Sequence, residues 1–149
     1  MRTNLRAKAV AVFLALAGSI LLTMSVTSGS AVAFFSGGLF LDVQVESPAT
    51  LVARGAAVDV PLEITCNATG SVDVFVSVTQ RSGSGVAQGF GFTTVGCTGS
   101  GQRVVVRVSA SAGGKSFKQG SAVAEAEVFG CRPNICGNET DTEVITINR

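Results

Sequence analysis

The chain has 149 residues, with eleven Lys and Arg, ten Asp and Glu, and no His, Trp or Tyr. Without histidine, a Ser-His or Cys-His nucleophile, an ordinary general base near neutral pH and a His-ligated metal are all excluded. We therefore expect no enzyme, no cofactor and no metal site. The charge is nearly balanced and no basic run follows the first ten residues, which argues against nucleic acid as a partner.

The first 33 residues have the pattern of a secretory signal peptide. Arg2, Arg6 and Lys8 precede an apolar run over 9–24, and Ala31-Val32-Ala33 supplies an A-x-A exit. The apolar run is shorter than the roughly 20 residues that a membrane-spanning helix needs. We therefore expect cleavage after Ala33, with a retained membrane anchor as the alternative.

Residues 34–149 would then form the exported domain, of 149 less 33, or 116, residues. A domain of this size can bury roughly two-thirds of its unfolded surface. Removal of the three leader cations leaves eight basic and ten acidic residues. The four cysteines, an even number in an exported chain, predict two disulfides. We expect a secreted, extracellular protein without a membrane span in the mature chain.

Short stretches of alternating apolar and polar residues follow one another through this domain. In the clearest, 56–66, every second residue from Val58 is apolar, as a half-buried strand requires. Pro61 has no N–H to donate, so it predicts either a bulge or a neighbour that pairs with only part of the strand. The other expected strands cover 39–46, 49–53, 72–79, 86–97, 103–108, 122–129 and 144–147.

Seven to eight strands separated by Gly and Ser turns predict an all-β fold, an Ig-like antiparallel β-sandwich. The turn at 67–70 predicts a hairpin between the strands that flank it. Phe117 is expected to anchor the chain after a polar loop. Residues 138–143 are rich in carboxylates and predict a solvated acidic turn, with a calcium site as the alternative.

If successive strands alternate in direction, all four cysteines lie at one pole: Cys66, Cys97, Cys131 and Cys136. Pairing Cys66 with Cys97 and Cys131 with Cys136 follows naturally, although the sequence alone allows three connectivities. The simplest interpretation is structural. The alternative is a binding surface at the stapled pole, formed by 67–70, 98–101 and 132–135, with Arg132 and Asn134 among its contacts.

Three phenylalanines are the available aromatic candidates for binding. Phe75 falls on the polar face of its strand, so we expect it on the outer surface or beneath a partner. Phe90 and Phe92 share one face, and core packing is the simplest interpretation of them. The alternative is an apolar groove for a ligand or a protein. Glu125 and Glu127 also share a face, which predicts a solvated surface rather than a glycosidase pair.

The stretches P-A-T-L-V-A-R-G-A-A-V-D-V-P-L-E-I-T-C at 48–66, S-V-T-Q-R-S-G at 77–83 and F-K-Q-G-S-A-V-A at 117–124 carry a resemblance. Together they resemble a group of small secreted actinobacterial Ig-like β-sandwich proteins of unassigned function. The resemblance implies the fold and export, with no activity attached.

The C-x-x-x-x-C loop at 131–136 is similar to that of the neocarzinostatin type of chromophore-carrying apoprotein. The other disulfide of that family closes a much shorter loop than one from Cys66 to Cys97 would close. No binding residues are therefore carried over.

The sequence thus predicts a non-catalytic exported module that acts through its surface, in adhesion, envelope interaction or recognition of a protein partner. The alternative is a carrier of a small apolar ligand in a groove near Phe75, Phe90 and Phe92. A filled core with flat faces favours the interaction module, and a pocket lined by these phenylalanines favours the carrier.

Overall fold

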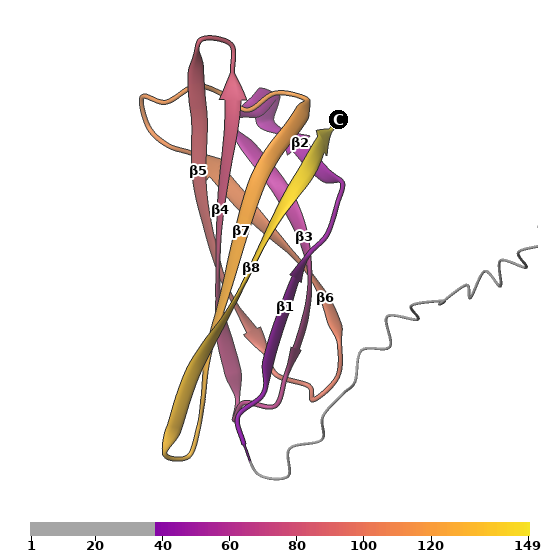
Figure 1. Ribbon diagram of the computed structural model, residues 1–149, viewed down its shortest axis with the longest axis vertical. Helices are drawn as coiled ribbons and strands as arrows, with labels where there is room; N and C mark the ends of the chain where they lie inside the picture. Colours follow the sequence, from indigo (N-terminus) through magenta and orange to yellow (C-terminus); the bar gives the residue numbers. More distant parts are fainter. Residues whose placement is uncertain (1–37) are drawn as a thin grey trace, which may run out of the picture. The chain divides into compact units, whose positions relative to one another are not determined.

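The computed structural model describes residues 38–149, so the expected signal peptide and its cleavage site lie outside the described residues. Within them, no helix is long and apolar enough to cross a bilayer. The secondary structure of residues 38–149 is one short 3-10 helix, η1 (Ala53–Gly55), and eight strands (Figure 1): β1 (Leu41–Val45), β2 (Ala49–Val52), β3 (Ala57–Cys66), β4 (Ser71–Ser82), β5 (Gly85–Gly96), β6 (Gln102–Ala110), β7 (Gly120–Arg132) and β8 (Ile135–Asn148).

Seven strands are hydrogen-bonded into a sheet that closes on itself, in the order β3-β2-β8-β7-β4-β5-β6 and back to β3. The eighth strand, β1, pairs with the same edge of β3 as β2 does, but further along that edge. The closing ladders are short, with two residue pairs each between β5 and β6 and between β2 and β8. The all-β prediction and the strand number are confirmed. The expectation of purely antiparallel pairing was wrong, because β2 and β8 run parallel.

The expected hairpin between β3 and β4 does not form. One edge of β3 pairs with β1 and β2 and the other with β6, whereas β4 pairs with β5 and β7. The connecting loop is held by other strands instead. The Thr69 amide donates to the Cys131 carbonyl at 3.0 Å, and the Gly70 carbonyl accepts from the Cys97 amide at 2.9 Å. Alternation shows which face of a strand is apolar, and it does not show which strand is the neighbour.

Pro61 lies within an unbroken β3. On one side it is opposite Val105 of β6, and on the other its carbonyl accepts a hydrogen bond from the Glu46 amide at 2.9 Å. Because the nitrogen and carbonyl of a strand residue point to the same side, the missing N–H faces the gap between β1 and β2. The partial pairing that the sequence predicted is confirmed, and the bulge is not needed.

The strand β8 is much longer than the expected 144–147. It pairs with β7 from Ile135 opposite Arg132 to Ile147 opposite Gly120. The segment 138–143 is therefore strand, and its prediction as an acidic turn was wrong. Both of its faces carry polar residues, so hydropathy shows no period of two there. Among residues 38–149, no group of three or more His, Cys, Asp or Glu side chains could hold a metal, so nothing supports the calcium alternative.

Short aliphatic side chains fill the core. Valines of β3 and β4 and alanines of β7 line it, and Phe117 is the one aromatic side chain buried among the described residues, which confirms its anchoring role. Gly89 and Gly91 of β5 face inward where β6 crosses closely. A Cβ on Gly91 would lie 2.5 Å from the Arg107 carbonyl oxygen, so only glycine lets the two backbones approach.

Candidate functional site

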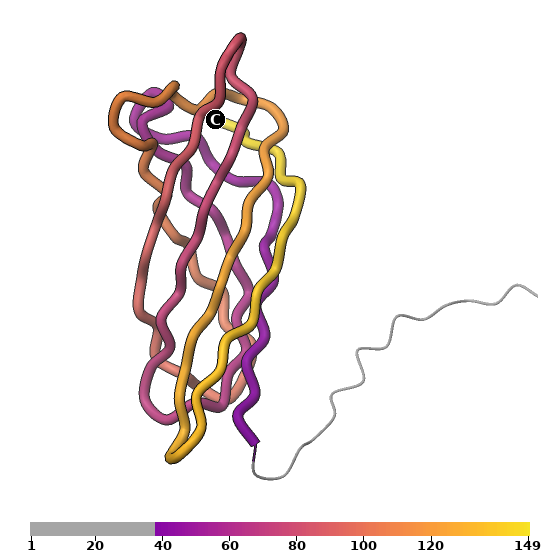
Figure 2. Tube along the Cα trace, turned by 60° about the vertical axis from the view of Figure 1, so that its left-hand side comes forward, coloured from indigo at the N-terminus to yellow at the C-terminus, as the bar shows by residue number. Residues whose placement is uncertain are grey.

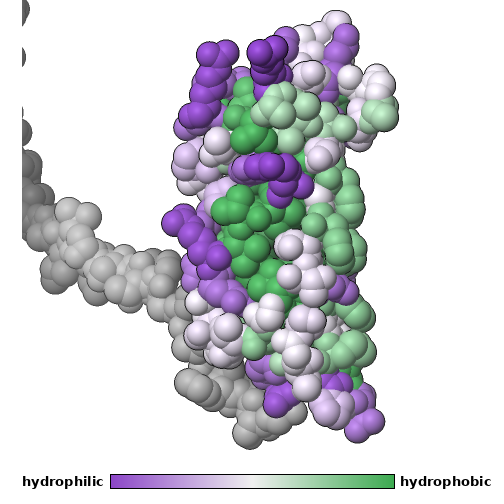
Figure 3. All heavy atoms as spheres, turned by 180° about the vertical axis from the view of Figure 1, so that it is seen from behind, coloured by the Kyte–Doolittle hydropathy of each residue, from purple (hydrophilic) through white to green (hydrophobic). Residues whose placement is uncertain are grey.

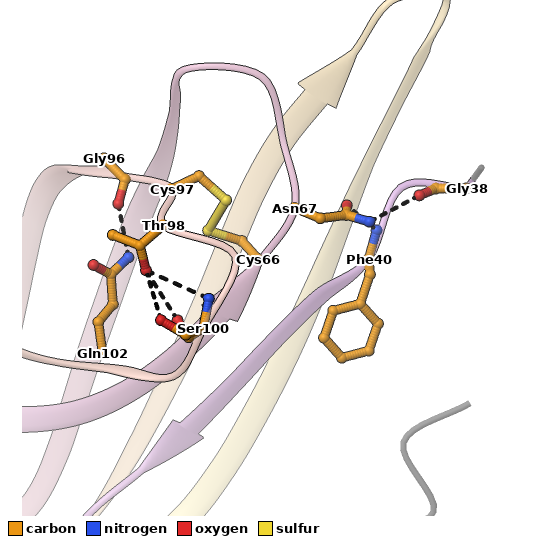
Figure 4. Close-up of a disulfide and its surroundings, with 9 residues drawn as sticks. All are labelled: Gly38, Phe40, Cys66, Asn67, Gly96, Cys97, Thr98, Ser100 and Gln102. Carbon is orange, nitrogen blue, oxygen red and sulfur yellow. Dashed lines mark hydrogen bonds between the residues drawn. A yellow bond between two sulfur atoms is a disulfide. The ribbon is translucent and has the colours of Figure 1, made fainter. Parts of the chain in front are cut away.

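Both disulfides form as predicted. Cys66–Cys97 connects the end of β3 to the end of β5 (Figure 4), and Cys131–Cys136 closes the β7–β8 hairpin. The loop 67–70 connects the two through its hydrogen bonds to Cys97 and Cys131. The placement of all four cysteines at one pole is therefore confirmed.

The polar side chains at this stapled pole hold the start of the described chain. Asn67 accepts a hydrogen bond from the Phe40 amide at 2.7 Å and donates one to the Gly38 carbonyl at 3.0 Å (Figure 4). Arg132 donates to the same carbonyl at 3.1 Å. Asn134 lies at the hairpin tip with a φ of 70°, a conformation that Asn tolerates. Arg132 and Asn134 thus have structural tasks at this pole.

The three candidate phenylalanines meet on the outer face of β4 and β5. We call Phe75, Phe90 and Phe92 the aromatic patch. The ring centre of Phe75 lies 5.0 Å from that of Phe92 and 6.1 Å from that of Phe90. The side of β5 that faces the core carries Ala87, Gly89 and Gly91 instead.

The outer position expected for Phe75 is confirmed, whereas core packing of Phe90 and Phe92 was wrong. Phe90 is 56% exposed and Phe92 is 53% exposed. The physical reason is the close crossing of β6, which requires glycine on the inner face of β5. Because successive residues of a strand point to opposite faces, Phe90 and Phe92, which alternate with these glycines, must point outward.

Two carboxylates from the neighbouring strand lie beside the aromatic patch. In the β4–β7 ladder Glu127 is opposite Phe75, and Glu125 is opposite Ser77. Asn138 of β8 donates a hydrogen bond to Glu127 at 2.8 Å, and neither glutamate makes an ion pair with another described residue. A hollow of about 150 Å³ lies between the two rings of Phe75 and Phe90 and the two glutamates.

The outer face of β3 and β6 differs, because both of its arginines form ion pairs. Asp59 accepts hydrogen bonds from Arg107 at 2.8 and 2.9 Å, and Glu46 pairs with Arg103 at 2.6 Å. The hydrogen bonds from Arg107 lower the pKa of Asp59. Figure 3 shows the molecule from behind, with an apolar strip that hydrophilic side chains interrupt and surround. Exposed Val105 belongs to this face.

No family model and no curated protein matches the chain. Among solved structures, the chain is similar to AggA, the major subunit of aggregative adherence fimbriae type I from Escherichia coli. The TM-score is 0.39 and the identity is 10%, over 74% of this chain and 95% of that chain. A TM-score of this size does not establish a shared fold.

Proposed function

We propose that the protein is an exported, non-catalytic module that binds a protein partner through the aromatic patch and the two glutamates beside it. One observation carries the proposal: two rings, each more than half exposed, lie in contact range of a third on a sheet face with no cover among the described residues. Clustered apolar surface of this kind is typical of an interaction site. Aromatic residues are also enriched at the centres of protein interfaces.

The partner in this proposal presents a basic segment. Glu125 and Glu127 have no cationic partner among the described residues, and they border rings whose faces attract cations. A Lys or Arg side chain that enters the hollow would contact the glutamates and the phenylalanine rings together. Charge complementarity of this kind selects partners and speeds association. The setting we propose is adhesion, contact with the cell envelope or recognition of another exported protein.

We also propose that the domain is an Ig-like sandwich and that it resides outside the cytoplasm. Long ladders group β1, β3 and β6 on one side and β5, β4, β7 and β8 on the other, and ladders of two or three pairs join the groups. This grouping supports an Ig-like sandwich whose edges are joined. Two disulfides are typical of an oxidising, extracytoplasmic compartment.

The alternative function is that of a carrier for a small apolar ligand. The hollow beside Phe75 and Phe90 measures about 150 Å³. Ligand pockets usually hold about 300–1,000 Å³. The hollow accommodates the end of one side chain rather than a whole ligand, so its size favours the interaction module.

The test uses the purified protein as bait for exported proteins of its own host. Phe90→Ser with Phe92→Ser removes the rings, and Glu125→Gln with Glu127→Gln removes the charges. Val105→Ser, an exposed apolar residue on the β6 face, is the matched control. We expect the native bait and the control to retain the same partner, and each double variant to retain at least about tenfold less.

The capture should also weaken at about 0.5 M salt, because charges contribute to it. Equal retention by all four baits would show that the patch is not the binding surface. Loss with the phenylalanine variant alone would keep the surface and reject the basic partner. A native mass spectrum with an apolar small molecule bound to the native protein but not to the phenylalanine variant, and no protein captured, would favour the carrier instead.

A further inference from the structure

A second cavity, of about 730 Å³, lies at the pole opposite the disulfides. Figure 2 shows the C-terminus and the loop before β7 at this end, away from the β7–β8 hairpin. The cavity lies within the size range of small-molecule sites. Its lining combines two apolar residues, one amide and three cations: Leu51, Phe117, Gln119, Arg54, Lys118 and Arg149.

One wall of the cavity is a turn with an unusual backbone. Ala53, Arg54 and Gly55 have φ values of 48°, 57° and 92°, so three successive residues are left-handed. Only glycine adopts this region readily, and the surrounding structure must hold the other two. Part of that hold is visible: the Phe117 amide donates to the Gly55 carbonyl at 2.9 Å, and a Cβ on Gly55 would collide with the Phe117 carbonyl oxygen. Arg54 therefore lines the cavity from a conformation that its own side chain does not favour.

The other wall is fixed by a buried amide. Gln80 of β4 is 3% exposed, and it makes a reciprocal pair of hydrogen bonds with the backbone of Lys118. Its amide nitrogen donates to the Lys118 carbonyl and its amide oxygen accepts from the Lys118 amide, both at 2.8 Å. A buried side chain thus fixes the backbone of an exposed lysine. The cationic wall is built before any ligand arrives.

The lining of the cavity is cationic, whereas the domain as a whole has more acidic than basic side chains. Residues 34–149 hold eight Lys and Arg and ten Asp and Glu, yet three of the eight cationic side chains line this cavity and no Asp or Glu does. The terminal carboxylate of Arg149 offsets one of these three positive charges, which leaves a net positive lining. Neither of the two ion pairs among the described residues involves Arg54, Lys118 or Arg149. Like charges gathered in a hollow repel one another, and an anion placed among them removes that repulsion.

We infer that this cavity binds a small organic anion, which carries at least one carboxylate or phosphate group. Arg54, Lys118 and Arg149 contact the anionic group, and Leu51 contacts an apolar part. Arginine suits both groups, since its planar donors match carboxylate and phosphate oxygens. The site lies at the end of the molecule away from the disulfides and uses none of the aromatic patch, so it stands or fails independently of the proposed function.

The test is a titration of ¹⁵N-labelled protein at low salt with two probes, citrate and inorganic phosphate, followed by amide chemical shifts. We expect saturable shifts at Leu51, in η1 and in 117–119, weakened by about 0.5 M sodium chloride. The test variant combines Arg54→Asn with Lys118→Gln. Asparagine is chosen because it tolerates the left-handed backbone. Lys115→Gln removes a cation from the same loop without touching the lining.

The double variant should bind at least about tenfold more weakly, as expected when charge-assisted contacts are lost. Lys115→Gln should bind as the native protein does. Saturation by citrate alone would assign a carboxylate, and saturation by phosphate alone would assign a phosphate group. Shifts that stay linear to about 20 mM of both probes would overturn the inference. So would equal weakening by Lys115→Gln, because it would indicate diffuse surface charge.

Discussion

The two disulfides close loops of very different length, so their removal should cost different amounts of stability. Cys66 and Cys97 are 31 residues apart, and loss of that cross-link should lower the free energy of unfolding by about 3.7 kcal/mol in the chain-entropy model. Cys131 and Cys136 are 5 residues apart, which gives about 2.1 kcal/mol. Burial increases the difference, because Cys66 packs in the core whereas Cys136 is exposed.

The variants are the double substitutions Cys66→Ala with Cys97→Ala and Cys131→Ala with Cys136→Ala. Urea unfolding without reductant measures each free energy, and equal slopes would show that the same surface unfolds in each. We expect the first variant to be less stable than the second by about 1.5 kcal/mol or more. Equal losses, or a larger loss from the hairpin disulfide, would refute the view that loop length and core burial decide the contribution.

Two further predictions test the closed sheet and the ion pairs. Gly91→Ala should destabilise by about 1–3 kcal/mol, because its Cβ meets the Arg107 carbonyl, whereas Gly96→Ala in the same strand meets open space and should not; urea unfolding compares them. Asp59→Asn should lower the urea midpoint at pH 7, and this difference should begin to shrink as the pH falls below about 4 and disappear once the pH passes the lowered pKa of the folded protein. The sign follows from the lowered pKa of Asp59, whose stabilising charge is present above the unfolded pKa and lost as the carboxyl protonates. A difference that does not shrink between pH 7 and about pH 2.5 would mean that the charge is not its source.

Alternation and cysteine positions predicted what depends on a single strand. The apolar face of β3 follows from the period of two, and the common pole of the cysteines follows from strand direction. The partial pairing at Pro61 follows from the N–H that proline lacks. Pairing partners did not follow, since a strand with one apolar face packs equally well beside or across from another. The missing β3–β4 hairpin is the clearest case.

The candidate sites were partly hidden for related reasons. Most of β8 was missed because its residues 138–143 are polar on both faces, yet this strand supplies Asn138 to orient Glu127. The cationic cavity combines η1, the segment 117–119 and Arg149, which no local pattern connects. The one usable signal was the two-residue interval at 54–55 between the expected strands 49–53 and 56–66, which did not indicate the left-handed backbone there.

The alternation Gly89-Phe90-Gly91-Phe92 ties the closure of the sheet to the aromatic patch, and its two halves have separate causes. The glycines are required because the β6 backbone leaves no room for a Cβ. That requirement says nothing about the outward positions, which the same strand fills with Gln88 and Thr94 elsewhere. Contact with Phe75 across the strands accounts for part of each ring, but more than half of each side chain stays exposed, and this is apolar surface that folding does not bury. A partner that covers the rings would account for this exposed surface, so loss of capture by a Phe90→Ser with Phe92→Ser variant that remains folded is the decisive outcome.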